Sequence, residues 1–243
     1  MRLEKKTTLL VFLIFIGTIT AFATLQHQKP TRQPQAVTEA DPRPIVDYVS
    51  STHDKNEPKR HSRGKRYDGG AVQGTGTQDG LVTFFDDWDF NVSVIPAGMS
   101  DAVVAGTVTD SKAYLSPDGT GVYSEFTLKV EKVLKDRSGT ISTTAPLAID
   151  RAGGRVRYPS GDIVKYIVSG QGMPRVNKRY VFFLKLEDQD FRILTGYELG
   201  AGGVSPLDMT VEKFKKYKGV DEATFLNQIR NAINSGSDTS GMR

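Results

Sequence analysis

The chain has 243 residues, of which 38% are hydrophobic and 25% charged, so it can hold one domain with appendages or two small domains. It contains no cysteine, which excludes a disulfide framework, a thiolate metal site, a thiol nucleophile and a lipid-modified N-terminal cysteine. The three histidines, His27, His53 and His61, precede the first region able to form a core. We therefore expect neither a Ser-His-Asp hydrolase nor a histidine-ligated metal in that core.

The net charge of +4 is concentrated at the N-terminal end. Residues 1–25 carry a net +2 and residues 26–66 a net +4, whereas residues 67–243 carry a net −2. A nucleic-acid-binding domain places its excess of lysine and arginine on the folded part, where phosphates must be neutralised. We therefore expect no nucleic-acid partner and assign the basicity to an export signal and a tether.

The N-terminus has the three-part pattern of a secretory signal. Arg2, Lys5 and Lys6 precede an apolar run over residues 9–16, and the small residues Ala21 and Ala23 follow it. Cleavage after Ala23 is one interpretation. An uncleaved hydrophobic helix is the other, because the uncharged stretch 7–25 is just long enough to span a bilayer. We expect residues 1–25 to be a signal peptide or a membrane anchor. Both put the remainder outside the cytoplasm, either secreted or periplasmic, or anchored to the membrane.

Residues 26–80 are rich in proline, glycine and charge and poor in large apolar side chains. Such a composition cannot bury enough surface to offset the entropy of ordering, so we expect a disordered linker. Within it, residues 45–49 form one stretch that could add as a strand to a sheet. The run Arg63-Gly64-Lys65-Arg66 fits a dibasic processing site, although a solvated basic segment is the commoner meaning of such a run.

Three aspartates lie among aromatic residues near the start of the predicted domain: Asp86, Asp87 and Asp89. A calcium loop of the EF-hand type needs oxygen ligands at alternate positions, a glycine at the sixth position and a distal glutamate. The aromatic residues interrupt that pattern and the glutamate is missing. We therefore favour an acidic surface turn, and we expect no metal and no cofactor.

The predicted folded domain, residues 81–234, contains many short strands separated by turn signals. Apolar or alternating segments occur over residues 101–115, 122–134, 143–149, 155–158, 163–168, 180–186 and 191–195. Residues 116–121, 159–162 and 187–190 predict short connections between them. In residues 122–131, Phe126 and Leu128 alternate with Tyr123 and Glu125, which predicts one buried and one solvated face. The alternation slips at residues 132–134, which predicts a β-bulge or a strand end.

The C-terminal region changes to a helical period. Asp221 is a suitable N-cap, and an apolar stripe follows at Phe225, Leu226, Ile229, Ala232 and Ile233 before Asn234-Ser235-Gly236. Such a stripe needs a surface to cover, so we expect an amphipathic helix over one open end or edge of the β-structure. Residues 235–243 are expected to be a flexible tail. The strand spacing favours a barrel or sandwich rather than β-α-β units.

Three segments carry a resemblance to a known group of proteins: SDAVVAGTV at residues 100–108, YSEFTLKVEKVLK at 123–135 and KRYVFFL at 178–184. Together they resemble mostly uncharacterised exported bacterial proteins with an OB-like barrel similar to the netrin-like modules of tissue inhibitors of metalloproteinases. The resemblance implies a mainly β domain, a single OB-like antiparallel barrel or sandwich. Those inhibitors chelate the protease metal through an N-terminal cysteine, which this chain lacks. The resemblance therefore supports a fold and not an activity.

Four basic residues surround one predicted hairpin: Arg151, Arg155, Arg157 and Lys165. Alternation puts Arg155 and Arg157 on the same face, where they could hold a carboxylate or a sulfate as a fork. A charged outer face of an edge strand is the commoner explanation. These four residues are the candidate anion or ligand contacts, and we expect no catalytic, cofactor-binding or metal-binding residue.

These observations favour a non-enzymatic extracytoplasmic module that binds a protein, peptide or glycan of the cell envelope through barrel loops or an edge strand. A carboxylate-dependent envelope hydrolase is one alternative. It could use acids such as Asp150, Asp162 and Glu198, but no pattern pairs any two of them. A purely structural envelope protein is the other alternative. If residues 1–25 stay uncleaved, they add a contact with the membrane.

Overall fold

The computed structural model describes residues 41–48, 58–69, 81–84 and 92–236. The fold is mainly β, as the sequence predicts. The strands and helices of the described residues belong to one unit over residues 42–243. Within the described residues, no helix is both long enough and apolar enough to cross a membrane. The predicted hydrophobic helix over residues 1–25 and the aspartates Asp86, Asp87 and Asp89 lie outside the described residues.

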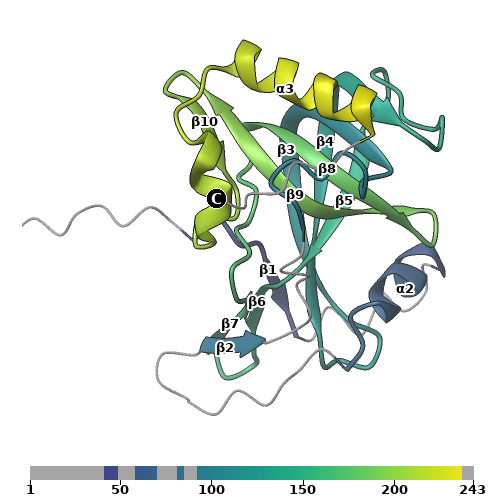
Figure 1. Ribbon diagram of the computed structural model, residues 1–243. Coiled ribbons are helices and arrows are strands. Elements are labelled where there is room, and N and C mark those ends of the chain that lie inside the picture. Colours follow the sequence, from purple (N-terminus) through teal and green to yellow (C-terminus); the bar gives the residue numbers. More distant parts are fainter. Residues whose placement is uncertain (1–40, 49–57, 70–80, 85–91, 237–243) are drawn as a thin grey trace, which may run out of the picture. The chain divides into compact units, whose positions relative to one another are not determined.

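Six strands form the main sheet: β3 (Ala102–Leu115), β4 (Val122–Asp136), β5 (Leu147–Ala152), β8 (Arg179–Glu187), β9 (Asp190–Gly200) and β10 (Gly203–Pro206). Their order is β10-β9-β5-β4-β3-β8, and β9 pairs in addition with β8. The neighbours therefore follow one another around a ring (Figure 1). Its weakest side is β5–β9, where two parallel residue pairs form, Ile149↔Phe191 and Asp150↔Arg192. The barrel is thus incompletely closed.

The predicted hairpin over residues 101–134 is confirmed as the antiparallel pair β3–β4. The pairing passes over Glu131 and Leu134 on β4, which is where the alternation slips in the sequence. Gly106 lies opposite this irregular part of β4. A Cβ at Gly106 would lie 2.3 Å from the carbonyl oxygen of Lys129, so the two backbones approach closely there because residue 106 has no side chain.

Both faces of the main sheet are covered by apolar side chains. On β8, Val181 and Phe183 belong to one buried cluster, and Phe182 and Leu184 belong to the other. The period of two places successive side chains on opposite faces, so a strand such as β8 supplies both clusters. The expectation of a solvated face on residues 122–131 is wrong at Tyr123, which is buried.

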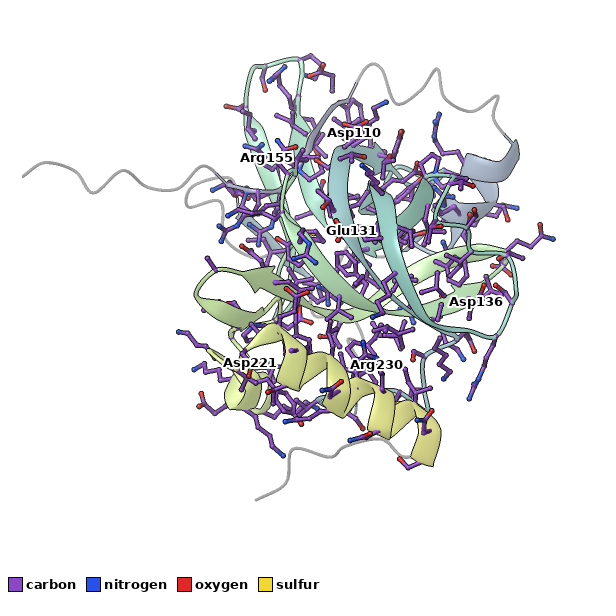
Figure 2. All side chains as sticks on the ribbon, turned by 90° about the horizontal axis from the view of Figure 1, so that it is seen from above. Asp110, Glu131, Asp136, Arg155, Asp221 and Arg230 are labelled. Atoms are coloured by element: carbon purple, nitrogen blue, oxygen red, sulfur yellow. The ribbon has the colours of Figure 1, made fainter. Side chains whose placement is uncertain are left out.

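The C-terminal helix α3 (Glu222–Ser235) covers one of these clusters, as its apolar stripe predicts. Asp221 accepts a hydrogen bond from the Thr224 N–H at 2.9 Å, and Gly236 ends the helix in a left-handed conformation. The Phe225 ring packs 4.7 Å from that of Tyr197 on β9. Figure 2 shows α3 running along one side of the sheet, with Asp221 at its start. The 3₁₀ helix η3 (Glu212–Tyr217) precedes it.

A second, four-stranded sheet has the order β1-β6-β7-β2. Its centre is the predicted hairpin of β6 (Gly154–Arg157) and β7 (Ile163–Val168), which pair antiparallel. The strand β1 (Ile45–Asp47) adds in parallel to β6, and β2 (Leu81–Phe84) adds in parallel to β7. Residues 45–47 thus add to a sheet edge, the possibility left open for residues 45–49 within the predicted linker.

Two pieces of the expected linker, residues 26–80, form regular structure. One is β1, and the other is the helix α2 (Pro58–Lys65), which is followed by a turn to residue 69. We call residues 58–69 the α2 segment. In Figure 1, α2 and α3 lie on different sides of the main sheet. Composition favours disorder here, and the structure differs because the segment finds specific polar partners on the sheet.

Candidate functional site

Four carboxylates from neighbouring strands form the candidate site: Glu125 on β4, Asp150 on β5, Glu187 on β8 and Asp190 on β9. We call them the acidic site. Strand register brings them together, because Glu125 pairs with Asp150, and Glu187 pairs with Asp190 across the β8–β9 turn. Asp150 is fully buried and Asp190 nearly so. Buried carboxylates are costly unless cations or hydrogen-bond donors reach them.

Arg63 of the α2 segment supplies one such cation. Its side chain is only 5% exposed, and its Nη2 lies 2.5 Å from Oδ1 of Asp190. Its Nη1 pairs with Glu125, and its Nε lies 3.4 Å from Oδ2 of Asp150. The guanidinium of Arg63 therefore meets carboxylates from three different strands.

Arg66 and Tyr67 supply further donors to the Asp150 carboxylate. The Nη2 of Arg66 lies 2.7 Å from Oδ2 of Asp150, and its Nη1 donates to the carbonyl oxygen of Glu187 at 3.1 Å. The hydroxyl of Tyr67 donates to Oδ1 of Asp150 at 2.5 Å. Both oxygens of the buried carboxylate thus receive donors from the α2 segment. From the sheet itself, Arg192 donates to Oε1 of Glu187 at 2.9 Å.

Stacked aromatic rings lie beside these charges. The Tyr67 ring stacks on that of Tyr123, with centroids 4.8 Å apart and planes 9° from parallel. Tyr123 stacks in turn on Tyr114, at 5.5 Å. The guanidinium carbon of Arg60 lies 4.6 Å from the centre of the Tyr114 ring, within the range of a cation–π interaction. This stack explains why Tyr123 is buried on a face that the alternation assigns to solvent.

The β3–β4 turn holds the end of the α2 segment. The Gly69 N–H donates to Oδ2 of Asp118 at 2.8 Å, and the Asp118 N–H donates to Oδ1 of Asp68 at 3.1 Å. The backbone of the β3–β4 turn approaches the α2 segment closely. A Cβ at Gly121 would lie 1.9 Å from the carbonyl oxygen of Tyr67, and one at Gly64 would lie 2.8 Å from Cδ of Pro117.

Burial and charge shift the titration of these groups. Burial raises the pKa of Asp150 above its ordinary value of 3.8, while Arg66, Tyr67 and Arg63 oppose that rise. Burial, reinforced by the Asp150 carboxylate, also raises the pKa of Tyr67 well above 10. Burial lowers the pKa of Arg63, but the hydrogen bond to Asp190 and the nearby carboxylates raise it above its ordinary value. Tyr67 therefore stays a donor and Arg63 a cation at neutral pH.

The α2 segment is held by polar and aromatic contacts. Neither of the two apolar clusters found in the described part of the chain includes a residue of this segment. The two apolar clusters of the main sheet and α3 thus form without it, although its Tyr67 ring covers Tyr123. The acidic site is the part of the sheet that needs the segment, because Asp150 and Asp190 are the charges that it neutralises.

The predicted contact Arg151 lies in a different environment. It is 1% exposed, its Nη1 lies 2.9 Å from Oδ1 of Asp208, and it donates to the carbonyl oxygen of Gly172 at 2.7 Å. Thr195 donates to the same Asp208 carboxylate at 2.8 Å. Arg151 thus joins β5 to the segment that follows β10.

The other three predicted contacts lie on the β6–β7 hairpin, where Arg155 pairs with Lys165 in the strand register. Arg155 donates to the carbonyl oxygen of Arg43 at 2.7 Å, and Arg157 lies 3.1 Å from Oδ1 of Asp47. Both arginines therefore help to hold the segment that contains β1. Figure 2 labels Arg155, which lies apart from α3. The structure does not bring Arg151 together with these three residues.

The described residues hold no group of three or more histidines, aspartates or glutamates arranged to bind a metal ion. Of the acids considered for a hydrolase, Asp150 belongs to the acidic site and Asp162 accepts a hydrogen bond from Ser160 in the β6–β7 turn. No pattern in the sequence links Glu125, Asp150 and Asp190. A usable signal was Asp150 itself, an acid inside an apolar strand, which requires a cationic partner.

No protein-family model matches the sequence, and no curated protein matches it. The functional argument therefore rests on the acidic site and its occupant.

Proposed function

We propose that the protein is an exported, non-enzymatic binding module that holds an arginine-bearing polypeptide segment in the acidic site. One observation carries the proposal: the α2 segment lies in this site with Arg63 and Arg66 on its carboxylates. Charge-assisted hydrogen bonds from arginine to carboxylate are strong and geometrically selective. A polypeptide from another chain with the same groups would find the same contacts.

The strand arrangement supports this proposal. The ring of neighbours β9-β5-β4-β3-β8, with one parallel contact between β5 and β9, agrees with the OB-like barrel that the resemblance implies. Barrels of this kind bind ligands through a strand face and adjoining loops. The acidic site occupies such a position, since it combines strand residues with the β8–β9 turn, and the α2 segment that lies in it also contacts the β3–β4 turn.

Binding explains the acidic site better than catalysis. A carboxylate-dependent hydrolase needs one protonated acid and one ionised carboxylate facing a substrate and a water molecule. Here Asp150 receives Arg66 and Tyr67, and Asp190 receives Arg63. These donors occupy carboxylate oxygens that a hydrolase would need to present to its substrate and water. Export is part of the proposal because of the signal-like pattern over residues 1–25.

The proposal is tested with a labelled peptide of residues 58–69 added to the full chain carrying Gly64→Ala. A Cβ at position 64 would contact the Pro117 ring, so this variant weakens the chain's own occupant and leaves every acidic-site residue unchanged. We expect saturable binding by fluorescence anisotropy. Adding Asp190→Asn to the same chain should weaken that binding, because the partner of Arg63 loses its charge. If the labelled peptide does not bind saturably to the Gly64→Ala chain, with or without Asp190→Asn, the proposal is refuted.

A further inference from the structure

The contacts of the α2 segment define a recognition pattern. Two guanidiniums three positions apart, from Arg63 and Arg66, meet the carboxylates, and the hydroxyl of the next residue, Tyr67, meets Asp150. Lys65, which lies between the arginines, is exposed. The site therefore contacts positions one, four and five of the pattern Arg-Gly-x-Arg-Tyr and leaves position three in solvent. Position two needs glycine, because a Cβ there would lie 2.8 Å from Cδ of Pro117.

The first position is selective for arginine over lysine. The Arg63 guanidinium pairs with Glu125 through Nη1 and with Asp190 through Nη2, and its Nε lies 3.4 Å from Oδ2 of Asp150 without a hydrogen bond. A planar guanidinium presents five N–H donors in a fixed fork, whereas the ammonium of lysine is a single point charge. Lysine at this position could not reach carboxylates from three strands at once.

The chain's own segment competes with any other ligand of this site. It supplies no side chain to the two apolar clusters, so its departure would expose the acidic site and the Tyr123 ring and would leave both clusters in place. A tethered ligand acts at an effective concentration that reaches the millimolar range for short flexible linkers. Any ligand from another chain binds only to the fraction of molecules in which the site is free, and its apparent affinity falls by that fraction.

We infer that the acidic site is a receptor for Arg-Gly-x-Arg-Tyr segments of other polypeptides, and that the α2 segment is a built-in competitor that limits their access. The inference rests on the proposed function and adds its ligand and its regulation. The partner carries two arginines on one turn of chain followed by tyrosine. The partner binds when its local concentration is high enough to displace the α2 segment. It also binds when damage to the α2 segment weakens the contacts of that segment with the site.

The experiment compares the natural full-length chain with the Gly64→Ala and Arg63→Ala chains. Each is titrated into labelled peptides of residues 58–69 that carry the natural sequence, Arg63→Lys, Arg66→Lys, Tyr67→Phe or Lys65→Ala. We expect the natural peptide to bind both variant chains at least about tenfold more tightly than the natural chain. The two arginine-to-lysine peptides should bind about tenfold more weakly than the natural peptide, and Lys65→Ala should bind like it. Circular dichroism checks that each chain is folded.

The outcomes separate the two proposals. Equal affinity of the natural peptide for all three chains would overturn the proposal that the α2 segment competes for the site. Equal affinity of the arginine and lysine peptides would overturn the proposal that the site selects arginine. In both cases binding to the acidic site, and hence the proposed function, would stand. Absence of binding by every peptide to every folded chain would overturn the proposed function and the inference together.

Discussion

The hydroxyl of Tyr67 donates a hydrogen bond to Oδ1 of Asp150, a residue 83 positions further along the chain. The contact joins the α2 segment to the most deeply buried carboxylate of the acidic site. Because the Tyr67 ring also stacks on Tyr123, one side chain makes a polar and an aromatic contact that mutation can separate.

Tyr67→Phe keeps the ring stacked on Tyr123 and removes the donor from Asp150. We expect docking of the α2 segment to weaken by about 1–3 kcal/mol, the cost of leaving a buried acceptor without its partner. Hydrogen exchange of the segment's amides, including the Tyr67 N–H that donates to the Gly64 carbonyl oxygen, measures the loss. Tyr67→Ala should lose more, because it removes the stack as well. If the two variants behaved alike, the ring stack would not contribute, and if Tyr67→Phe behaved like the natural chain, the hydroxyl would not contribute.

Gly121→Ala tests the close approach of the β3–β4 turn to the segment. Its Cβ would lie 1.9 Å from the carbonyl oxygen of Tyr67, so we expect the end of the α2 segment to lift away while the sheet persists. Exchange should speed up in residues 66–69. The matched control is Gly202→Ala, whose Cβ meets nothing within 4 Å. Faster exchange throughout β3 and β4 instead would show that the substitution distorts the β3–β4 hairpin and leaves the α2 segment in place.

Arg151→Met breaks the buried ion pair with Asp208. We expect unfolding in urea to become easier by about 3–5 kcal/mol, since the Asp208 carboxylate stays buried without its cation. The double variant Arg151→Met, Asp208→Leu removes both charges and should recover part of this loss. A double variant as unstable as the single one would mean that packing, and not charge, sets the cost.

Acid should loosen the junction between the β3–β4 turn and the α2 segment. Burial by itself raises the pKa of Asp118, but hydrogen bonds from Ser116, Thr120 and Gly69 lower it well below 3.8. A carboxyl group whose pKa is lower in the folded state stabilises that state above its unfolded pKa, and the contribution is lost as the pH falls through its folded pKa. The stability difference between the natural chain and Asp118→Asn should therefore shrink as the pH drops below about 4. Urea unfolding across the acid range measures it, and a difference that stays constant would contradict the shift.

Local patterns predicted the hairpins and the C-terminal helix. These features depend on residues that are close in the sequence. They include the turn over residues 116–121, the irregular pairing near Glu131 and Leu134, and the Asp221 cap. Near-neighbour interactions decide such features, so a single sequence contains them. The alternation in β6 likewise leaves Arg155 half-buried and Arg157 exposed, with Val156 buried between them.

The acidic site could not be predicted in the same way. Arg63 and Asp190 are 127 positions apart, and Arg66 and Asp150 are 84 apart. Their contact depends on the order of the strands and on a segment whose average composition favours disorder. Arg151 illustrates the same point, because its partner Asp208 lies on a segment 57 positions away. The sequence contains the charges, but strand order decides which of them meet.

The small sheet also bears on how the protein behaves in concentrated solution. The two outer edges of the β6–β7 hairpin are each paired with a short strand, β1 on one side and β2 on the other. Unpaired edges are templates for aggregation, and short added strands blunt them. A truncated chain beginning after Asp47 would expose the backbone edge of β6 to other molecules, so a shortened form of this protein should aggregate more readily than the full chain.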